Sequence, residues 1–104
     1  MKVYRLYIED KDDKQSNSLI AHLARNYFPD GLTIQKAEGL WKGKWENTLI
    51  VIAAVEPTQW EYYNKALPLP VIGAANFAIG YLSQEAVGIE YDGRLEFIYS
   101  TVQS

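Results

Sequence analysis

A chain of 104 residues can build one hydrophobic core but not two, so we expect a single domain over residues 1–104. Its composition, 48% apolar and 22% charged, is typical of a globular protein rather than a disordered one. The net charge of −3 repels a phosphate backbone and argues against nucleic-acid binding. The chain has no Cys and one His, which excludes disulfides, thiolate chemistry, and cysteine-based or multi-histidine metal sites.

The first residues predict a strand over Val3–Glu9, in which apolar and aromatic side chains alternate between two faces. Arg5 and Glu9 interrupt the apolar residues, so the segment does not resemble a signal peptide. The longest apolar-rich stretch, Leu67–Leu82, contains two Pro and two Gly and is shorter than the roughly 20 residues that span a bilayer. We therefore expect a cytoplasmic protein that does not contact a membrane.

A helix is predicted to begin near Asp12, which is suited to cap it, and to end at Pro29-Asp30-Gly31. Between these points apolar residues recur at helical spacing and form one stripe that faces the sheet. His22 falls on or near the opposite side of the helix. It is the first candidate for acid–base chemistry near neutral pH, but its position predicts a surface histidine without a catalytic role.

Two strands are predicted in the middle of the chain, over residues 32–41 and over Thr48–Val55. The second is apolar on both faces, which indicates a central strand, or a strand with one face used for dimerisation. A short helical stretch is expected to open at Pro57 and to be broken by Pro68-Leu69-Pro70.

Residues 72–84 predict a second main helix that is apolar nearly all round and is therefore buried on more than one side. The chain closes with strands over 87–91 and 94–99, and Asp92-Gly93 between them favours a type I′ turn. This order of elements predicts an α+β domain of the ferredoxin-like, split βαβ class, β-α-β-β-α-β with an extra C-terminal strand, in which helices pack on an antiparallel sheet. That fold hosts many unrelated functions.

One segment carries a resemblance to a known family. The sequence reads Phe28-Pro29-Asp30-Gly31-Leu32-Thr33, then Gly39-Leu40-Trp41, then Glu46 before the third strand. In these residues it resembles a family of small bacterial proteins that carry a ferredoxin-like domain of unknown function. The resemblance implies the fold and carries over no activity. A phage or mobile-element origin would also fit a compact lone domain.

No catalytic or metal-binding residues are predicted. The acidic run Glu9–Asp13 lacks the alternating ligands and the glycine of a calcium-binding loop, and no serine lies in a Gly-x-Ser-x-Gly turn. Gly73-Ala74-Ala75-Asn76 at a helix start lacks the lysine of a phosphate-binding loop. We therefore expect no cofactor.

The most unusual segment is Trp41-Lys42-Gly43-Lys44-Trp45, in which two indoles flank a basic tip. Such a tip can stack on a planar ring while its lysines attract phosphate or carboxylate. Together with two aromatic residues from the short helical stretch, this predicts a ligand- or partner-binding surface made of Trp41, Lys42, Lys44, Trp45, Trp60 and Tyr63. The alternative interpretation is that these rings close the ends of a small core.

Two classes of function are compatible with these observations. The first is a non-catalytic binding module, as a homodimer, that captures a small anionic or nucleotide-like ligand or blocks a partner protein. The alternative is a small cofactor-independent enzyme of the dimeric α+β barrel type that uses Gln84, Glu85 or Asn76 in a cavity between helices and sheet. The lack of a catalytic constellation favours the first class. Self-association is expected because the third strand and the second main helix present more apolar surface than one core layer can cover.

Overall fold

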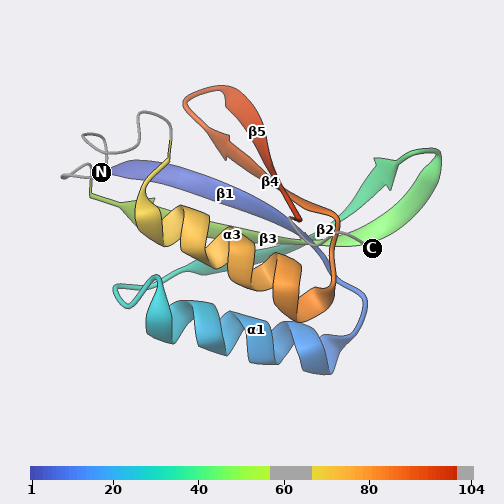
Figure 1. Ribbon diagram of the computed structural model, residues 1–104, viewed down its shortest axis with the longest axis horizontal. Helices are drawn as coiled ribbons and strands as arrows, with labels where there is room; N and C mark the ends of the chain where they lie inside the picture. The colour runs from blue at the N-terminus through green and yellow to red at the C-terminus, as the bar shows by residue number, and fades with distance from the viewer. Residues whose placement is uncertain (57–66, 101–104) are drawn as a thin grey trace.

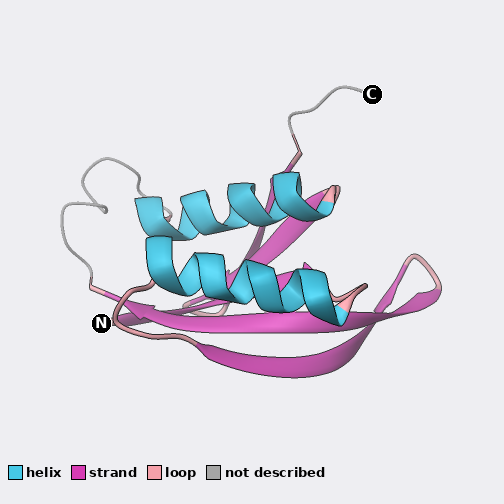
Figure 2. Cartoon of the chain, turned by 90° about the horizontal axis from the view of Figure 1, so that it is seen from below, coloured by secondary structure: helices cyan, strands magenta, loops and turns pink. Residues whose placement is uncertain are grey.

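The protein is an α+β structure in which two helices cover one face of a five-stranded antiparallel sheet (Figures 1 and 2). The computed structural model describes residues 1–56 and 67–100. The elements are β1 (Lys2–Glu9), α1 (Asp13–Asn26), β2 (Thr33–Trp41), β3 (Lys44–Val55), α3 (Leu69–Leu82), β4 (Ala86–Tyr91) and β5 (Arg94–Tyr99). The α+β class predicted from the sequence is confirmed.

The strands follow the order β2-β3-β1-β4-β5, with every neighbouring pair antiparallel. Side chains alternate between the two faces of the sheet, as the pattern in β1 predicted. Leu6, Val51 and Ile89 lie fully buried beneath the helices. Tyr7 and its cross-strand neighbours point to the face that no helix covers, which we call the open face.

The β2–β3 hairpin is longer than the sequence predicted, because β3 begins at Lys44 instead of Thr48. Lys42 and Gly43 form a two-residue turn with φ values of 50° and 78°, as in type I′ geometry. This tight turn lets the residues before Thr48 pair with β2, so the hairpin continues past the last pair between β1 and β3, Glu9↔Thr48. The expected type I′ turn at Asp92-Gly93 is confirmed, with φ values of 48° and 74°.

Helix α1 begins beside Asp12, as predicted, but ends at Asn26, before the predicted end at Pro29-Asp30-Gly31. The interpretation of His22 as a surface histidine also needs correction. The Asp12 side chain caps the helix by accepting a hydrogen bond of 3.0 Å from the Lys14 backbone N–H. His22 does point away from the sheet, but α3 lies beside α1 in the same layer (Figure 2). The His22 imidazole stacks on the Phe77 ring of α3 with 3.7 Å between ring centroids and 7° between planes.

Helix α3 starts at Leu69, earlier than the predicted residue 72. Pro68 is its N-cap and Pro70 lies in its first turn, where no intrahelical donor is lost, so the prolines open this helix instead of separating it from the previous segment. The helix ends at Ser83 in the left-handed conformation, with φ 55° and ψ 42°. The predicted short helical stretch that contains Trp60 and Tyr63 lies mostly outside the described residues.

The core fills the layer between the two helices and the sheet. Its fully buried residues come from both helices and from the central strands, as shown by Leu19, Val71, Leu49 and Val87. Within the described part of the chain, no helix is both long and apolar enough to cross a membrane.

Candidate functional site

Large apolar side chains stay exposed on the open face of the sheet. By the strand register, this face carries Val3, Trp41, Leu95, Phe97 and Tyr99, whose exposed fractions range from 39% for Phe97 to 62% for Tyr99. Scattered exposed apolar residues are normal on a protein surface, but Trp41, Phe97 and Tyr99 have their rings near one another, and such a group on one sheet face indicates a binding or association surface.

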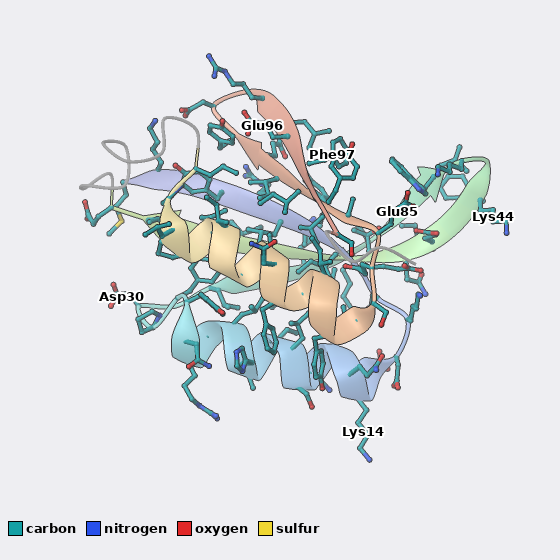
Figure 3. The ribbon with its side chains drawn as sticks, viewed as in Figure 1. Lys14, Asp30, Lys44, Glu85, Glu96 and Phe97 are labelled. Carbon is teal, nitrogen blue, oxygen red and sulfur yellow. The ribbon has the colours of Figure 1, made fainter. Side chains whose placement is uncertain are left out.

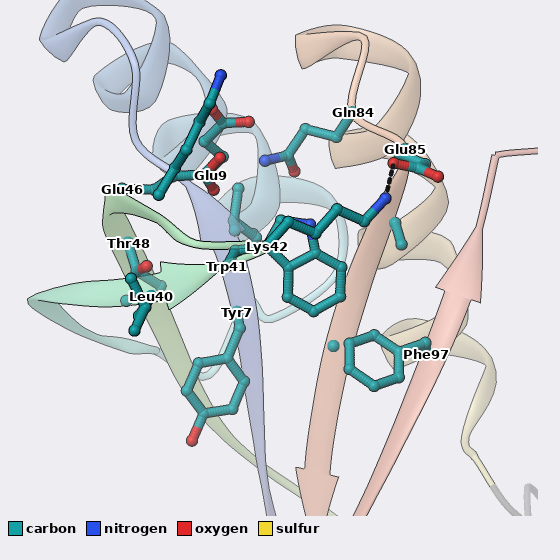
Figure 4. A pocket seen from close by; sticks show the side chains of 15 residues that line it. Tyr7, Glu9, Leu40, Trp41, Lys42, Glu46, Thr48, Gln84, Glu85 and Phe97 are labelled. Atoms are coloured by element: carbon teal, nitrogen blue, oxygen red, sulfur yellow. Dashed lines mark ion pairs between the residues drawn. The ribbon is translucent and has the colours of Figure 1, made fainter.

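The open face is concave. Trp41 and Phe97 belong to β2 and β5, the opposite edge strands, which would lie about 19 Å apart in a flat five-stranded sheet. Their ring centroids are instead 6.1 Å apart, with 42° between the ring planes. The Lys42 Nζ also lies 3.9 Å from the Glu85 Oε2, so the tip of the β2–β3 hairpin reaches the residue before β4 (Figure 4). The sheet therefore curls, and the hairpin closes over the open face.

Two adjoining pockets occupy this concave face, and together we call them the groove. The first, of about 480 Å³, is lined by residues from all five strands and by Gln84 and Glu85 before β4. The second, of about 420 Å³, lies along β4 and β5 and includes Glu90 and Arg94. The pockets share Tyr7, Trp41, Gly88 and Phe97. Volumes of this size are typical of sites for small molecules.

The floor of the groove depends on Gly88. In the register, Gly88 of β4 pairs with Tyr7 on one side and with Phe97 on the other. A Cβ at residue 88 would lie 3.2 Å from the Phe97 Cε1, closer than ordinary van der Waals contact. The missing side chain lets the Phe97 ring lie over the strand, so Trp41, Tyr7 and Phe97 present three aromatic rings to one space (Figure 4).

A tyrosine–glutamate pair stands in the groove. The Tyr7 hydroxyl donates a short hydrogen bond of 2.5 Å to the Glu90 Oε1. This hydrogen bond, followed by burial and the Glu90 charge, raises the pKa of Tyr7 above 10.0, while the Arg5 charge opposes the rise. Near neutral pH the Tyr7 hydroxyl is therefore protonated and holds the Glu90 carboxylate in one place among the aromatic rings.

Gln84 lines the first pocket and has an unpaired polar atom in its side chain. Its side chain is almost completely buried, with 7% of the residue exposed. Its Oε1 atom has no hydrogen-bond partner within residues 1–56 and 67–100. In Figure 4 the Gln84 side chain projects from the segment before β4 toward the side of the pocket formed by Glu9 and Glu46. Buried acceptors without a hydrogen-bond partner are uncommon, so we expect this atom to have a partner that the described residues do not supply.

The predicted binding residues are only partly brought together. Trp41, Lys42 and Lys44 line the first pocket. Trp45 lines neither pocket and is 70% exposed, so it does not close a core either. Trp60 and Tyr63 lie outside the described residues.

The cavity proposed for the enzyme alternative was misplaced. Gln84 and Glu85 do line a pocket, but it lies on the open face and not between helices and sheet, because buried apolar side chains fill that layer. Asn76 is exposed on α3 and lines neither pocket of the groove.

Sequence reasoning missed most residues of the groove, among them Tyr7, Gly88, Glu90 and Phe97. The one available signal was strand alternation, which places them on the face opposite the core. Alternation does not show whether that face is flat or concave. No group of His, Asp or Glu side chains that could hold a metal ion is found in the part of the chain that the structure describes.

The chain is similar in fold to a solved structure but matches no sequence-family model. No family model matches the chain, and no curated protein matches it significantly. The resemblance to a small bacterial ferredoxin-like family therefore stays a prediction. A solved structure of a phage SAM lyase in its apo state is similar in fold, with a TM-score of 0.65 and 14% sequence identity, over 99% of this chain and 92% of that chain.

This likeness contradicts the prediction of a non-catalytic binding module. The protein with the similar fold is an enzyme, which agrees with the alternative of a small enzyme better than with passive capture of a ligand. At 14% identity the comparison establishes the shared α+β fold, with its antiparallel sheet and helices.

Proposed function

We propose that this protein is a small cofactor-independent enzyme that cleaves a carbon–sulfur bond of a sulfonium compound such as S-adenosylmethionine (SAM). The observation that carries the proposal is the Tyr7–Glu90 pair set beside Trp41 and Phe97 in a groove of suitable size. The likeness to a phage SAM lyase over nearly the whole chain supports it.

The groove has the chemistry to bind a sulfonium cation. The π faces of aromatic rings attract cations, an effect of about 0.5 to 2 kcal/mol that grows as water is removed. Trp41, Tyr7 and Phe97 supply three rings that line both pockets. Glu90 adds a half-buried carboxylate whose position the Tyr7 hydroxyl fixes. A positively charged sulfur is therefore expected to lie between the rings and this carboxylate.

A lyase-type cleavage at this position needs no external reactant. The electron pair of the broken carbon–sulfur bond stays on sulfur, which leaves as a neutral thioether. The carbon fragment then either loses a proton to form a double bond, with Glu90 as the proton acceptor, or closes a ring through its own nucleophile. In both routes the sulfur loses its positive charge, and an apolar groove favours this loss of charge more than bulk water does.

We propose the ferredoxin-like split βαβ arrangement, with β5 added at one edge, supported by the antiparallel order β2-β3-β1-β4. A cytoplasmic location and a phage or mobile-element origin stay predictions, and the likeness to a phage protein supports the second.

The test is incubation of the purified protein with SAM, followed by chromatography of the adenine-containing products. The identity of the thioether shows which carbon–sulfur bond breaks. Glu90→Gln should lower kcat/KM about 10- to 150-fold, as expected for the loss of a charge-assisted contact. Tyr7→Phe should lower it less, because the carboxylate remains but is no longer held.

A second Tyr–Glu pair provides matched controls. The Tyr91 hydroxyl donates a hydrogen bond of 2.7 Å to the Glu96 Oε1, and in the strand register this pair belongs to the helix-covered side of the sheet. Glu96 lies on β5 of the β4–β5 hairpin, and Figure 3 shows it apart from Glu85. Glu96→Gln and Tyr91→Phe should leave kcat/KM within about twofold. Failure of the wild-type protein to consume SAM, or equal activity of Glu90→Gln and Glu96→Gln, would refute the proposal.

A further inference from the structure

We infer that Gln84 recognises the adenine ring of the substrate, so that the groove selects adenosyl sulfonium compounds over sulfonium compounds without adenine. This inference rests on the proposed function and names the substrate class for the same groove. It starts from the unpaired Oε1 of Gln84, which is buried in the wall of the first pocket.

The Gln84 backbone is held on both sides. The N–H groups of Ser83 and Gln84 both donate to the Ile79 carbonyl oxygen at the end of α3, the second at 3.0 Å. On the other side, the Glu85 carbonyl oxygen accepts a hydrogen bond of 2.8 Å from the Ser100 backbone N–H. Ser83 adopts the left-handed conformation, which is unfavourable for a residue with a side chain and persists where the surroundings require it. The amide is therefore presented to the pocket from a fixed backbone.

A primary amide matches one edge of adenine. It offers an acceptor oxygen and a donor nitrogen side by side, and adenine offers the N6 donor and the N7 acceptor with the same spacing. Hypoxanthine, which carries a carbonyl oxygen in place of the N6 amino group, presents two acceptors at this edge. The amide then cannot satisfy both contacts, so the pocket should reject inosyl analogues.

The ammonium group of SAM, which is a donor as the ribose hydroxyls are, is a less suitable partner for this atom than the adenine amino group. An ammonium ion loses more hydration energy on burial than a neutral amino group, and Gln84 carries no charge to compensate for that loss. The carboxylates of Glu9 and Glu46 line the same pocket and are more accessible to solvent. We therefore expect the ammonium group to lie near the Glu9 and Glu46 carboxylates, and the edge of the adenine ring to lie at Gln84.

The linings of the two pockets are consistent with one substrate that extends across both. Gln84 belongs to the first pocket only, and Glu90 to the second only, while Trp41 and Phe97 line both. Adenine can stack on the Trp41 ring while its edge reaches Gln84. The sulfonium then lies toward the Tyr7–Glu90 pair.

The test uses neutral thioethers, so that it does not depend on catalysis. Calorimetric titration of 5′-methylthioadenosine and 5′-methylthioinosine into the wild-type protein should show about 5- to 150-fold tighter binding of the adenine compound. Gln84→Met, which keeps the side-chain volume but removes the amide, should abolish this preference. Gln15→Met, an exposed glutamine on α1, is the matched control and should retain it.

The outcomes separate this inference from the proposed function. Equal binding of the two nucleosides to the wild type, no measurable binding of either, or an unchanged preference in Gln84→Met would overturn the inference, even if SAM is cleaved. Weaker binding of SAM but unchanged binding of 5′-methylthioadenosine in Gln84→Met would assign the amide to the ammonium group and also overturn it. An adenine preference that depends on Gln84, without any cleavage of SAM, would support the inference and refute the proposed reaction.

Discussion

Gln84→Met should make the ligand-free protein more stable, although it should weaken adenine recognition. A buried polar atom without a hydrogen-bond partner lowers stability by about 1 to 3 kcal/mol. The Oε1 of Gln84 is such an atom within the described residues, and the residue is 7% exposed. Methionine has similar volume and adapts to irregular space, so the packing penalty should stay below about 1.5 kcal/mol.

The expected net gain is about 1 kcal/mol in the free energy of unfolding. For a domain of about 100 residues, 1 kcal/mol corresponds to a rise in Tm of about 4 to 8 °C. Urea unfolding and thermal melting of the ligand-free protein would measure both quantities, and Gln15→Met should change the free energy by no more than about 0.5 kcal/mol. Added 5′-methylthioadenosine should stabilise the wild type more than Gln84→Met, because a ligand stabilises the state that binds it.

A loss of stability would refute this reasoning. If Gln84→Met unfolds at lower urea concentration than the wild type, its amide makes a structural hydrogen bond in the free protein. The unpaired oxygen would then no longer indicate a missing ligand.

The hydrogen bond to Glu90 raises the pKa of Tyr7, so the stability that it contributes is present below pH 10.0 and is lost as the pH rises through the folded-state pKa. In urea unfolding across this pH range, Tyr7→Phe should lose less of its free energy of unfolding than the wild type. An identical loss in the two proteins would contradict a stabilising Tyr7–Glu90 pair. Gly88→Ala should narrow the groove and reduce SAM turnover, with a stability change below about 1 kcal/mol because the Phe97 ring is partly exposed and can move; normal turnover would count against the groove. His22→Ala should lower the free energy of unfolding by about 0.5 to 1.5 kcal/mol through loss of the stack on Phe77, whereas no measurable change would show that the stack is weak. Light scattering at tens of micromolar should report a dimer or larger species, as the exposed apolar side chains of the open face suggest, and a clean monomer would remove this expectation.

The elements whose signals are local could be predicted from the amino-acid sequence alone. Alternation in Val3–Glu9 predicted a strand, Asp12 predicted a helix start, and Asp92-Gly93 predicted the type I′ turn, all of which the structure contains. Each signal depends on a few neighbouring residues and on backbone preferences, so it survives without knowledge of the rest of the chain. The start of α3 was missed because Pro68 and Pro70 suit the first turn of a helix as well as a break between helices.

The groove, in contrast, depends on contacts between residues that are far apart in the sequence. Tyr7 and Glu90 are 83 residues apart in the sequence, and they meet because β1 and β4 are paired in the sheet. Trp41 was predicted to bind a ligand, but its nearness to Phe97 depends on the curl of the sheet and on the long β2–β3 hairpin. Sheet curvature is a collective property of packing and twist across many strands, so no short segment encodes it. The sequence therefore indicated aromatic residues at a hairpin tip, and the fold turned them into one wall of a groove.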